Sequence, residues 1–153
     1  MIESVIPYLK AGLCVLPAEN KFPILARQEK KHEWGEYQHR IPSYSLFEGI
    51  KMEQLCMICG KVSGGVEVID VDNTWDKTSS VFNELKSVVD TFDLPIVINQ
   101  TKRCGFHFIY RCEEIEANQK LAQFRDDNGK KKTAIETRGG GGLVIIPPSQ
   151  GYE

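Results

Sequence analysis

The chain has 153 residues, of which 41% are hydrophobic and 26% are charged, and its formal net charge is −2. This length supports one domain with its own core and is short for two. The weak negative charge excludes a strongly basic nucleic-acid clamp, so any nucleic-acid binding must come from local patches or from other parts of a longer protein.

The first half of the chain is predicted to begin with a helix and continue into strands. Ser4 can cap a helix that runs through Lys10, with Pro7 in the first turn, where a missing N–H is tolerated. The elements predicted after it are a strand at 13–16, an irregular polar excursion at 17–42, a brief helix at 44–50 capped by Ser43, and strands at 55–59 and 66–71.

The second half is predicted to open with a longer helix, from Asn73 or Thr74 to about Asp90. Its apolar stripe consists of Val81, Phe82, Leu85, Val88 and Val89. The elements predicted after it are strands at 96–101 and 106–111, a helix at 116–124, a turn at 127–129, and strands at 133–138 and 143–146. Adjacent strands with interspersed helices predict an α+β fold.

Membrane segments and a disulfide framework are both absent from the sequence pattern. No apolar stretch approaches membrane-spanning length, and the N-terminus lacks a signal-peptide pattern, which predicts a soluble cytoplasmic protein. The odd number of cysteines, five, predicts reduced thiols. Cys56 and Cys59 have C-x-x-C spacing, but no second pair completes a zinc site, so buried structural cysteines are expected.

Asp70 and Asp72 end the apolar, β-branched run that begins at Val66. Because strand side chains alternate, both aspartates point from the same face. Adjacent carboxylates repel each other, and a cation between them removes that cost; hard oxygen ligands favour Mg²⁺ or Mn²⁺. Aspartates at a strand end also commonly cap a turn or a helix, and the pattern by itself leaves both readings open.

Two further strands carry polar side chains in apolar surroundings. His107 lies between Phe106 and Phe108, which point to the opposite face, and Glu136 shares a face with Arg138. If these strands lie beside the aspartates, three carboxylates, an imidazole and a guanidinium converge. Taken singly, His107 could be an ordinary strand histidine, and Glu136 with Arg138 an ordinary surface pair.

These segments resemble the archaeo-eukaryotic primase superfamily in content and in order. In particular they look like the bifunctional primase–polymerase N-terminal domain of plasmid, phage and mobile-element replication proteins. That domain has a hydrophobic-Asp-x-Asp motif, a Gly-Gly-x-His or Ser-x-His motif, and a third acid before Arg-Gly. The similar segments here are 66–72, 101–107, 135–140 and 147–149, with 11–17, 21–23 and 60–64 nearer the N-terminus.

The chain departs from the family pattern at a few positions. Glu136 stands where Asp is common, Cys104 stands at the first Gly of Gly-Gly-x-His, and Gly105 replaces the Ser of Ser-x-His. Family members continue beyond the segment that ends here at Gly151 and Tyr152. Residues 1–153 are therefore expected to be a single catalytic domain, the N-terminal fragment of a longer replication protein with a helicase or a helical primase region.

The resemblance implies a small N-terminal α/β module beside an RRM-like module, with the active site in the cleft between them. It also implies a metal-dependent, template-directed nucleotidyltransferase that makes or extends primers from nucleoside triphosphates on a single-stranded DNA template. Two divalent ions about 3.5–4 Å apart serve such a reaction. The implied roles are metal binding for Asp70, Asp72 and Glu136, nucleotide-phosphate contact without metal ligation for His107, and triphosphate contacts for Arg138, Lys102 and Arg103.

Several patterns stay open between a functional and a structural interpretation. Residues 139–142, all glycine, could approach the nucleotide or form a hairpin turn. Residues 130–132, all lysine, could contact template phosphates or lie in a solvated loop, and Trp34, Tyr37 and Tyr44 could stack on bases or simply pack. Two rival functions also remain: a catalytically weak nucleic-acid-binding module, and a metal-dependent phosphoesterase.

Overall fold

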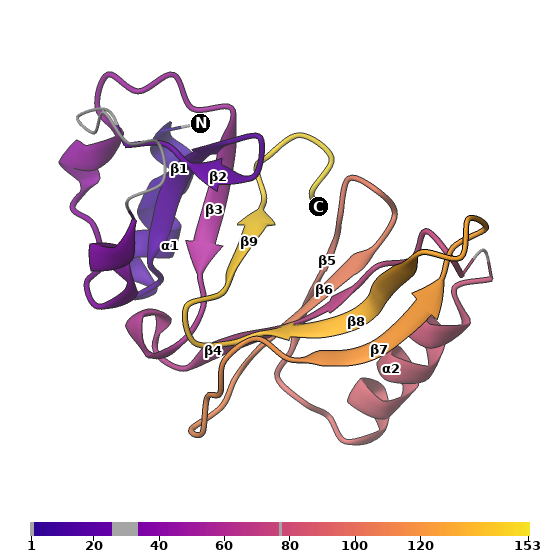
Figure 1. The fold of residues 1–153 in the computed structure, drawn as a ribbon. Coiled ribbons are helices and arrows are strands. Elements are labelled where there is room, and N and C mark those ends of the chain that lie inside the picture. The colour runs from indigo at the N-terminus through magenta and orange to yellow at the C-terminus, as the bar shows by residue number, and fades with distance from the viewer. Residues whose placement is uncertain (1, 26–33, 77) are drawn as a thin grey trace.

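Two antiparallel β-sheets form the fold, which is α+β, as predicted (Figure 1). The computed structural model describes residues 2–25, 34–76 and 78–153. The first sheet has the order β2 (Phe22–Pro23), β1 (Val15–Glu19), β3 (Gln54–Ile58) and β9 (Leu143–Ile146). The second has the order β5 (Val97–Gln100), β6 (Phe106–Arg111), β4 (Val66–Val71), β8 (Lys131–Arg138) and β7 (Lys120–Arg125).

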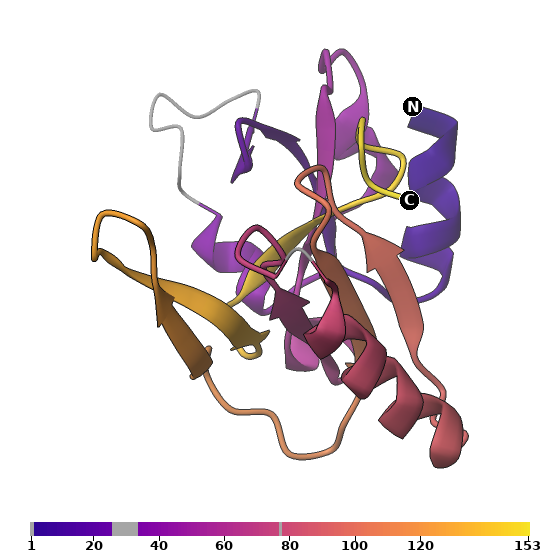
Figure 2. The same cartoon turned by 90° about the vertical axis from the view of Figure 1, so that its right-hand side faces the viewer.

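The two α-helices cover different sheets. α1 (Val5–Lys10) contributes Val5 to the core of the first sheet, and α2 (Ser80–Thr91) lies along the second (Figure 2). The Phe82 ring of α2 stacks on Phe106 of β6 with centroids 3.9 Å apart, so α2 covers the face that carries Phe106. The short 3₁₀ helices are η1 (Ile2–Ser4), η2 (Gly35–Gln38), η3 (Tyr44–Phe47) and η4 (Lys61–Ser63).

β4 connects the two sheets through its side chains. Val66 and Val68 are buried in one cluster with Leu55 and Met57 of β3. Asp70 follows on the same face, since side chains in a strand alternate. The first half of β4 is thus anchored in the core of the first sheet, and its second half leaves that core with carboxylates on the same face.

Most of the predicted strands are confirmed, and the helix predicted at 116–124 is wrong. Lys120–Arg125 is strand β7, paired with β8 across a register shift. Leu121 and Phe124 have helical spacing, but pairing with β8 satisfies the backbone and overrides that local preference. The turn at 127–129 is confirmed: the Gly129 N–H donates to the Asp126 carbonyl at 2.8 Å.

The long helix is predicted too early. α2 begins at Ser80, and Asp76, not Asn73 or Thr74, accepts a free N–H of its first turn: the Val81 N–H donates to Asp76 Oδ2 at 3.0 Å. The predicted stripe faces the second sheet but is only partly buried: Val81, Phe82, Leu85 and Val89 are half-buried, and Phe82 packs on Phe106. No described residue of α2 is buried, and the side chain of Val88 is 51% exposed.

Smaller corrections concern the N-terminal third. β1 extends to Glu19 and pairs with β2, so 17–42 is not wholly irregular; residues 26–33 lie outside the described part of the chain. Ser4 and Ser43 stand at the expected helix starts, but neither side chain makes a capping hydrogen bond. The segment after Ser43 is the 3₁₀ helix Tyr44–Phe47.

Candidate active site

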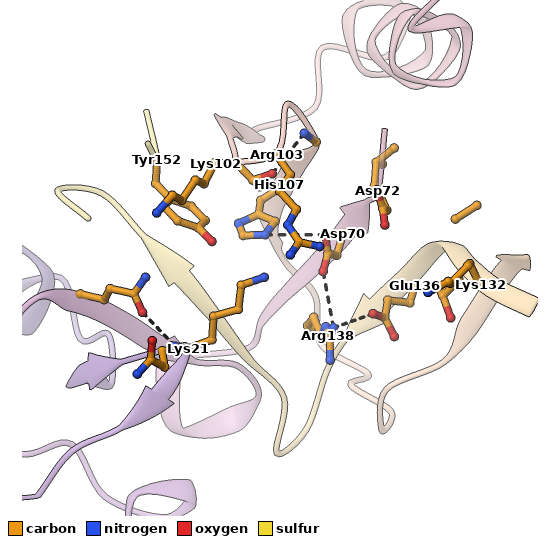
Figure 3. A pocket seen from close by; sticks show the side chains of 17 residues that line it. Lys21, Asp70, Asp72, Lys102, Arg103, His107, Lys132, Glu136, Arg138 and Tyr152 are labelled. Atoms are coloured by element: carbon orange, nitrogen blue, oxygen red, sulfur yellow. Dashed lines mark hydrogen bonds and ion pairs between the residues drawn. The ribbon is translucent and has the colours of Figure 1, made fainter. Parts of the chain in front are cut away.

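Three predicted site residues lie in one row across the second sheet. In the strand register Asp70 of β4 is directly opposite His107 of β6 on one side and Glu136 of β8 on the other. Residues that face each other across an antiparallel pair share one face of the sheet. The pairing therefore brings two carboxylates and an imidazole side by side (Figure 3).

This row lines a cavity of about 720 Å³ to which both sheets contribute. The first sheet and its β1–β2 turn contribute Gln54 and Lys21 to the cavity, and the second sheet contributes the row of Asp70, His107 and Glu136, which we call the acidic row. A neighbouring cavity of about 380 Å³ shares Lys21, Asp70, His107, Arg138 and Tyr152 with it. The described residues that line the larger cavity are Asn20, Lys21, Gln54, Asp70, Val71, Asp72, Thr101, Lys102, Arg103, Gly105, His107, Lys132, Thr133, Ala134, Glu136, Arg138 and Tyr152.

Arg138 lies between the carboxylates of the row. Its Nη2 atom donates to Glu136 Oε1 at 2.5 Å and lies 3.5 Å from Asp70 Oδ2 (Figure 3). Burial raises the pKa of the Asp70 carboxyl; the charges of Arg138 and Lys21 oppose that shift, and Asp72 adds to it. Asp70 is thus a desolvated acid that depends on nearby positive charge to stay ionised.

His107 is an almost fully buried imidazole. Burial lowers its pKa to about 4, with further lowering by the charges of Arg138 and Lys21, so it is neutral at pH 7. Nε2 lies 3.7 Å from Asp70 Oδ1, and Nδ1 is buried with no hydrogen-bond partner within the described residues. A neutral imidazole carries a single N–H, so His107 can donate one hydrogen bond and accept another.

The residues around His107 hold it on this face. Phe106 and Phe108 point away from the cavity and contact Phe82 of α2, with centroids 3.9 and 5.8 Å away. Gly105 packs so closely on β4 that a Cβ there would lie 2.4 Å from the Val71 carbonyl oxygen. The Gly that replaces Ser in the motif is thus required by packing. The close packing of Gly105 on β4 fixes the backbone that leads to His107 and so orients the imidazole toward the cavity.

Asp72 combines the two roles that its sequence position allowed. It lines the cavity, while Oδ1 accepts the Thr74 N–H at 2.9 Å in a local turn. Its own N–H donates to the Ala134 carbonyl at 2.9 Å, which continues the pairing of β4 with β8 for one residue. The turn fixes one carboxylate oxygen and leaves the other for a ligand.

Basic residues on two loops surround the acidic row. Lys102 and Arg103 lie in the loop between β5 and β6, are exposed, and line the larger cavity. Lys21 was not among the predicted site residues, although its Lys-x-Pro segment matched a family motif. It occupies a two-residue turn between β1 and β2, where Asn20 and Lys21 have φ of 50° and 69°, values typical of a tight hairpin turn.

The structure places the glycine run, the lysine run and the three aromatic residues whose roles the sequence left open. A Cβ at Gly139 would lie 2.1 Å from the Glu116 carbonyl oxygen, so this glycine is needed where β8 crosses to β9. Lys132 lines the larger cavity, and Lys130 and Lys131 are exposed. Tyr37 is buried in the first-sheet core. Trp34 packs against the same core and lines the smaller cavity, and Tyr44 is exposed.

Cys56 and Cys59 are buried, as predicted for this C-x-x-C pair. All five cysteines are free, and Cys14 is buried as well. Burial raises the pKa of each of these three thiols to about 12. They stay protonated at neutral pH, so none of the three is an activated nucleophile.

The carboxylates of this site have the donor atoms that a divalent ion prefers, but their side chains are not arranged to hold one. Asp70, Asp72 and Glu136 offer hard oxygen atoms in one cavity, and the Arg138 guanidinium already stands as a cation between two of them. Over residues 2–25, 34–76 and 78–153, however, no three Asp, Glu, His or Cys side chains are close enough together to be a ready-made metal site. Side chains must move before an ion is held.

A comparison with protein families gives a match over nearly the whole chain. A family model described as bifunctional DNA primase/polymerase, N-terminal, matches residues 6–153. No curated protein matches the chain. In the part of the chain that the structure describes, no helix is long and apolar enough to cross a membrane.

Proposed function

The chain belongs to the bifunctional DNA primase/polymerase N-terminal family, and from this premise we propose that it is a divalent-metal-dependent, template-directed nucleotidyltransferase. It would make or extend primers on single-stranded DNA in the replication of a plasmid, phage or mobile element. The observation that carries the proposal is the row of His107, Asp70 and Glu136 on one face of a cavity bordered by Lys21 and Lys102.

The arrangement of the second sheet supports an RRM-like module. Strand β4 is followed by α2, β5 and β6, and the sheet order is β5-β6-β4-β8. A four-stranded sheet with a βαββ start is typical of such modules. Here the hairpin strand β7 stands where a second helix would precede the last strand. The cavity between this sheet and the first supports the cleft that the family resemblance implies.

The acidic side chains suit metal binding. Asp70, Asp72 and Glu136 would hold one or two Mg²⁺ or Mn²⁺ ions, which neutralise charge on the reacting phosphate and activate the attacking hydroxyl when bound. The burial that raises the pKa of Asp70 also lowers the local dielectric, so that its attraction to a cation is strong. In nucleotidyl transfer the 3′-hydroxyl oxygen bonds to the α-phosphorus, the bond to the bridging oxygen breaks, and pyrophosphate leaves.

The basic and neutral donors suit the triphosphate. Lys21, Lys102 and Arg103 place positive charge along the cavity wall without approaching the carboxylates at bonding distance. His107 would donate an N–H to a phosphate oxygen as a neutral group, because its lowered pKa keeps it unprotonated at the pH of the reaction. This role needs no metal ligation by the imidazole.

Incubation with a primed single-stranded template, Mn²⁺ and labelled nucleotides tests the proposal. Template-dependent extension is the expected result, and Asp70→Asn should abolish it. Binding of template without extension would favour the catalytically weak nucleic-acid-binding module. Cleavage of the template without extension would favour a phosphoesterase, since an acidic cluster can activate water as well as a sugar hydroxyl.

A further inference from the structure

Arg138 occupies the space between Asp70 and Glu136, two of the acids proposed to hold the metal. Its Nη2 atom is 2.5 Å from Glu136 Oε1 and 3.5 Å from Asp70 Oδ2. Its Nε atom is buried and has no hydrogen-bond partner within the described residues. The guanidinium therefore neutralises the acidic pair with one edge and leaves a desolvated donor unused on the other.

A divalent ion and this guanidinium compete for the same place. An ion shared by Asp70 and Glu136 must lie within about 2.0–2.6 Å of oxygens of both carboxylates. Nη2 already stands between those carboxylates, and its positive charge would repel the ion at close range. Ion binding by both acids therefore requires Arg138 to leave them.

The surroundings of Arg138 offer a second position. Its side chain lines both the larger and the smaller cavity, so it can turn within open space instead of into the core. A nucleoside triphosphate in the larger cavity would bring anionic oxygens within reach of that turn. Guanidinium groups bind phosphate through paired N–H donors, which would also satisfy the Nε atom that is now unpaired.

We propose that Arg138 is an internal counterion that holds the acidic row together without metal and moves to the nucleotide phosphates when ion and nucleotide bind. The inference rests on the proposed function and adds a coupling to it. The ion displaces the guanidinium from the carboxylates, and the guanidinium then pairs with the triphosphate. Each ligand should therefore strengthen the binding of the other by the same factor.

Calorimetric titration of Mn²⁺, alone and with a non-hydrolysable nucleoside triphosphate, tests this coupling in the whole chain. With Mn²⁺ alone, Arg138→Gln should bind the ion about tenfold or more tightly than wild type, because the competing charge is gone. The gain in Mn²⁺ affinity on adding nucleotide should be smaller in this variant than in wild type, and the gain that remains comes from direct contact between the ion and the phosphates. Arg125→Gln is the matched control: Arg125 lies on neighbouring β7 outside both cavities, and should behave as wild type.

Thermal melting provides a second readout. Without metal, Arg138→Gln should melt below wild type, since Glu136 and Asp70 lose their counterion, and Mn²⁺ should raise its melting temperature by more than that of wild type. If Arg138→Gln does not fold, Arg138→Lys keeps a cation and should keep wild-type Mn²⁺ affinity while losing nucleotide affinity. Mn²⁺ affinity equal to or below wild type in Arg138→Gln overturns the counterion role alone. Failure of wild type to bind Mn²⁺, with or without nucleotide, overturns the proposed function as well.

Discussion

Gly105→Ala should disturb both the fold and the site, because this glycine packs directly against β4. A Cβ at position 105 would lie 2.4 Å from the Val71 carbonyl oxygen and 3.0 Å from Thr101 Oγ1. The Gly105 N–H also donates to Thr101 Oγ1 at 3.1 Å, which closes the loop that precedes β6. The neighbouring atom is backbone in a paired strand, so the methyl group has no flexible side chain to push aside.

The structure gives the size of the effect. Carbon–oxygen contacts between adjacent strands settle near 3.3–3.6 Å, so the new methyl carbon must move by about 1 Å from its 2.4 Å position. Forcing extra volume into a packed position costs about 1–3 kcal/mol, which lowers the melting temperature of a chain this long by roughly 2–12 °C. A displacement of about 1 Å at His107, two residues later, would reduce turnover by up to about 100-fold.

Melting followed by circular dichroism, together with primer extension, measures both effects. Gly35→Ala is the matched control, because a Cβ there meets no atom of the described residues within 4 Å and the residue has no positive φ. That variant should melt and turn over as wild type. A Gly105→Ala protein with wild-type melting temperature and wild-type extension would refute the reasoning that packing at this glycine directs His107.

The remaining predictions concern four side chains. Cys104 has φ of 58°, so Cys104→Gly should stabilise the chain by roughly 1 kcal/mol in urea unfolding. The left-handed strain that it relieves should exceed the extra backbone entropy that glycine loses on folding, and a loss of stability would contradict this. Asp76→Ala should lower the melting temperature at pH 7, because the Asp76 carboxylate accepts the Val81 N–H and its pKa is lowered to about 2. The difference in melting temperature between wild type and variant should disappear as pH falls from about 4 to about 2, and an unchanged difference would contradict this prediction. Asp70→Asn should melt at or above wild type at pH 7 without metal, because burial raises the pKa of the Asp70 carboxyl. Protonation of Asp70 stabilises the fold below about pH 4, and that contribution is lost as pH rises through the raised pKa. A fall in melting temperature would indicate a structural role for the carboxylate. His107→Ala should raise the apparent nucleotide constant in primer extension more than it changes Mn²⁺ affinity by calorimetry, and an unchanged nucleotide constant would remove His107 from the site.

Strand alternation predicts from sequence which face of its strand each residue of the acidic row occupies. Asp70, His107 and Glu136 each stand in a β-branched or aromatic run, and such runs define a face whatever the order of the strands. Which residues face each other across the strands came only from the register, which depends on pairing between segments far apart in the chain.

What sequence could not predict depends on tertiary contacts. Lys120–Arg125 forms a strand because it pairs with β8. The spacing of apolar residues within the segment carries no information about that partner. Lys21 reaches the cavity only because the first sheet packs beside the second, although its Lys-x-Pro segment marked it as a family feature. The position of Arg138 between two acids follows from side-chain rotamers, which the alternation of a strand leaves undetermined.

Anomalous diffraction from crystals grown with Mn²⁺ and a non-hydrolysable nucleoside triphosphate tests the central claim most directly. The account predicts manganese peaks within about 2.0–2.6 Å of carboxylate oxygens of Asp70, Asp72 and Glu136, with Arg138 turned from the acids toward the phosphates. A nucleotide-bound crystal with no manganese at these carboxylates, or with manganese bound elsewhere, would contradict it.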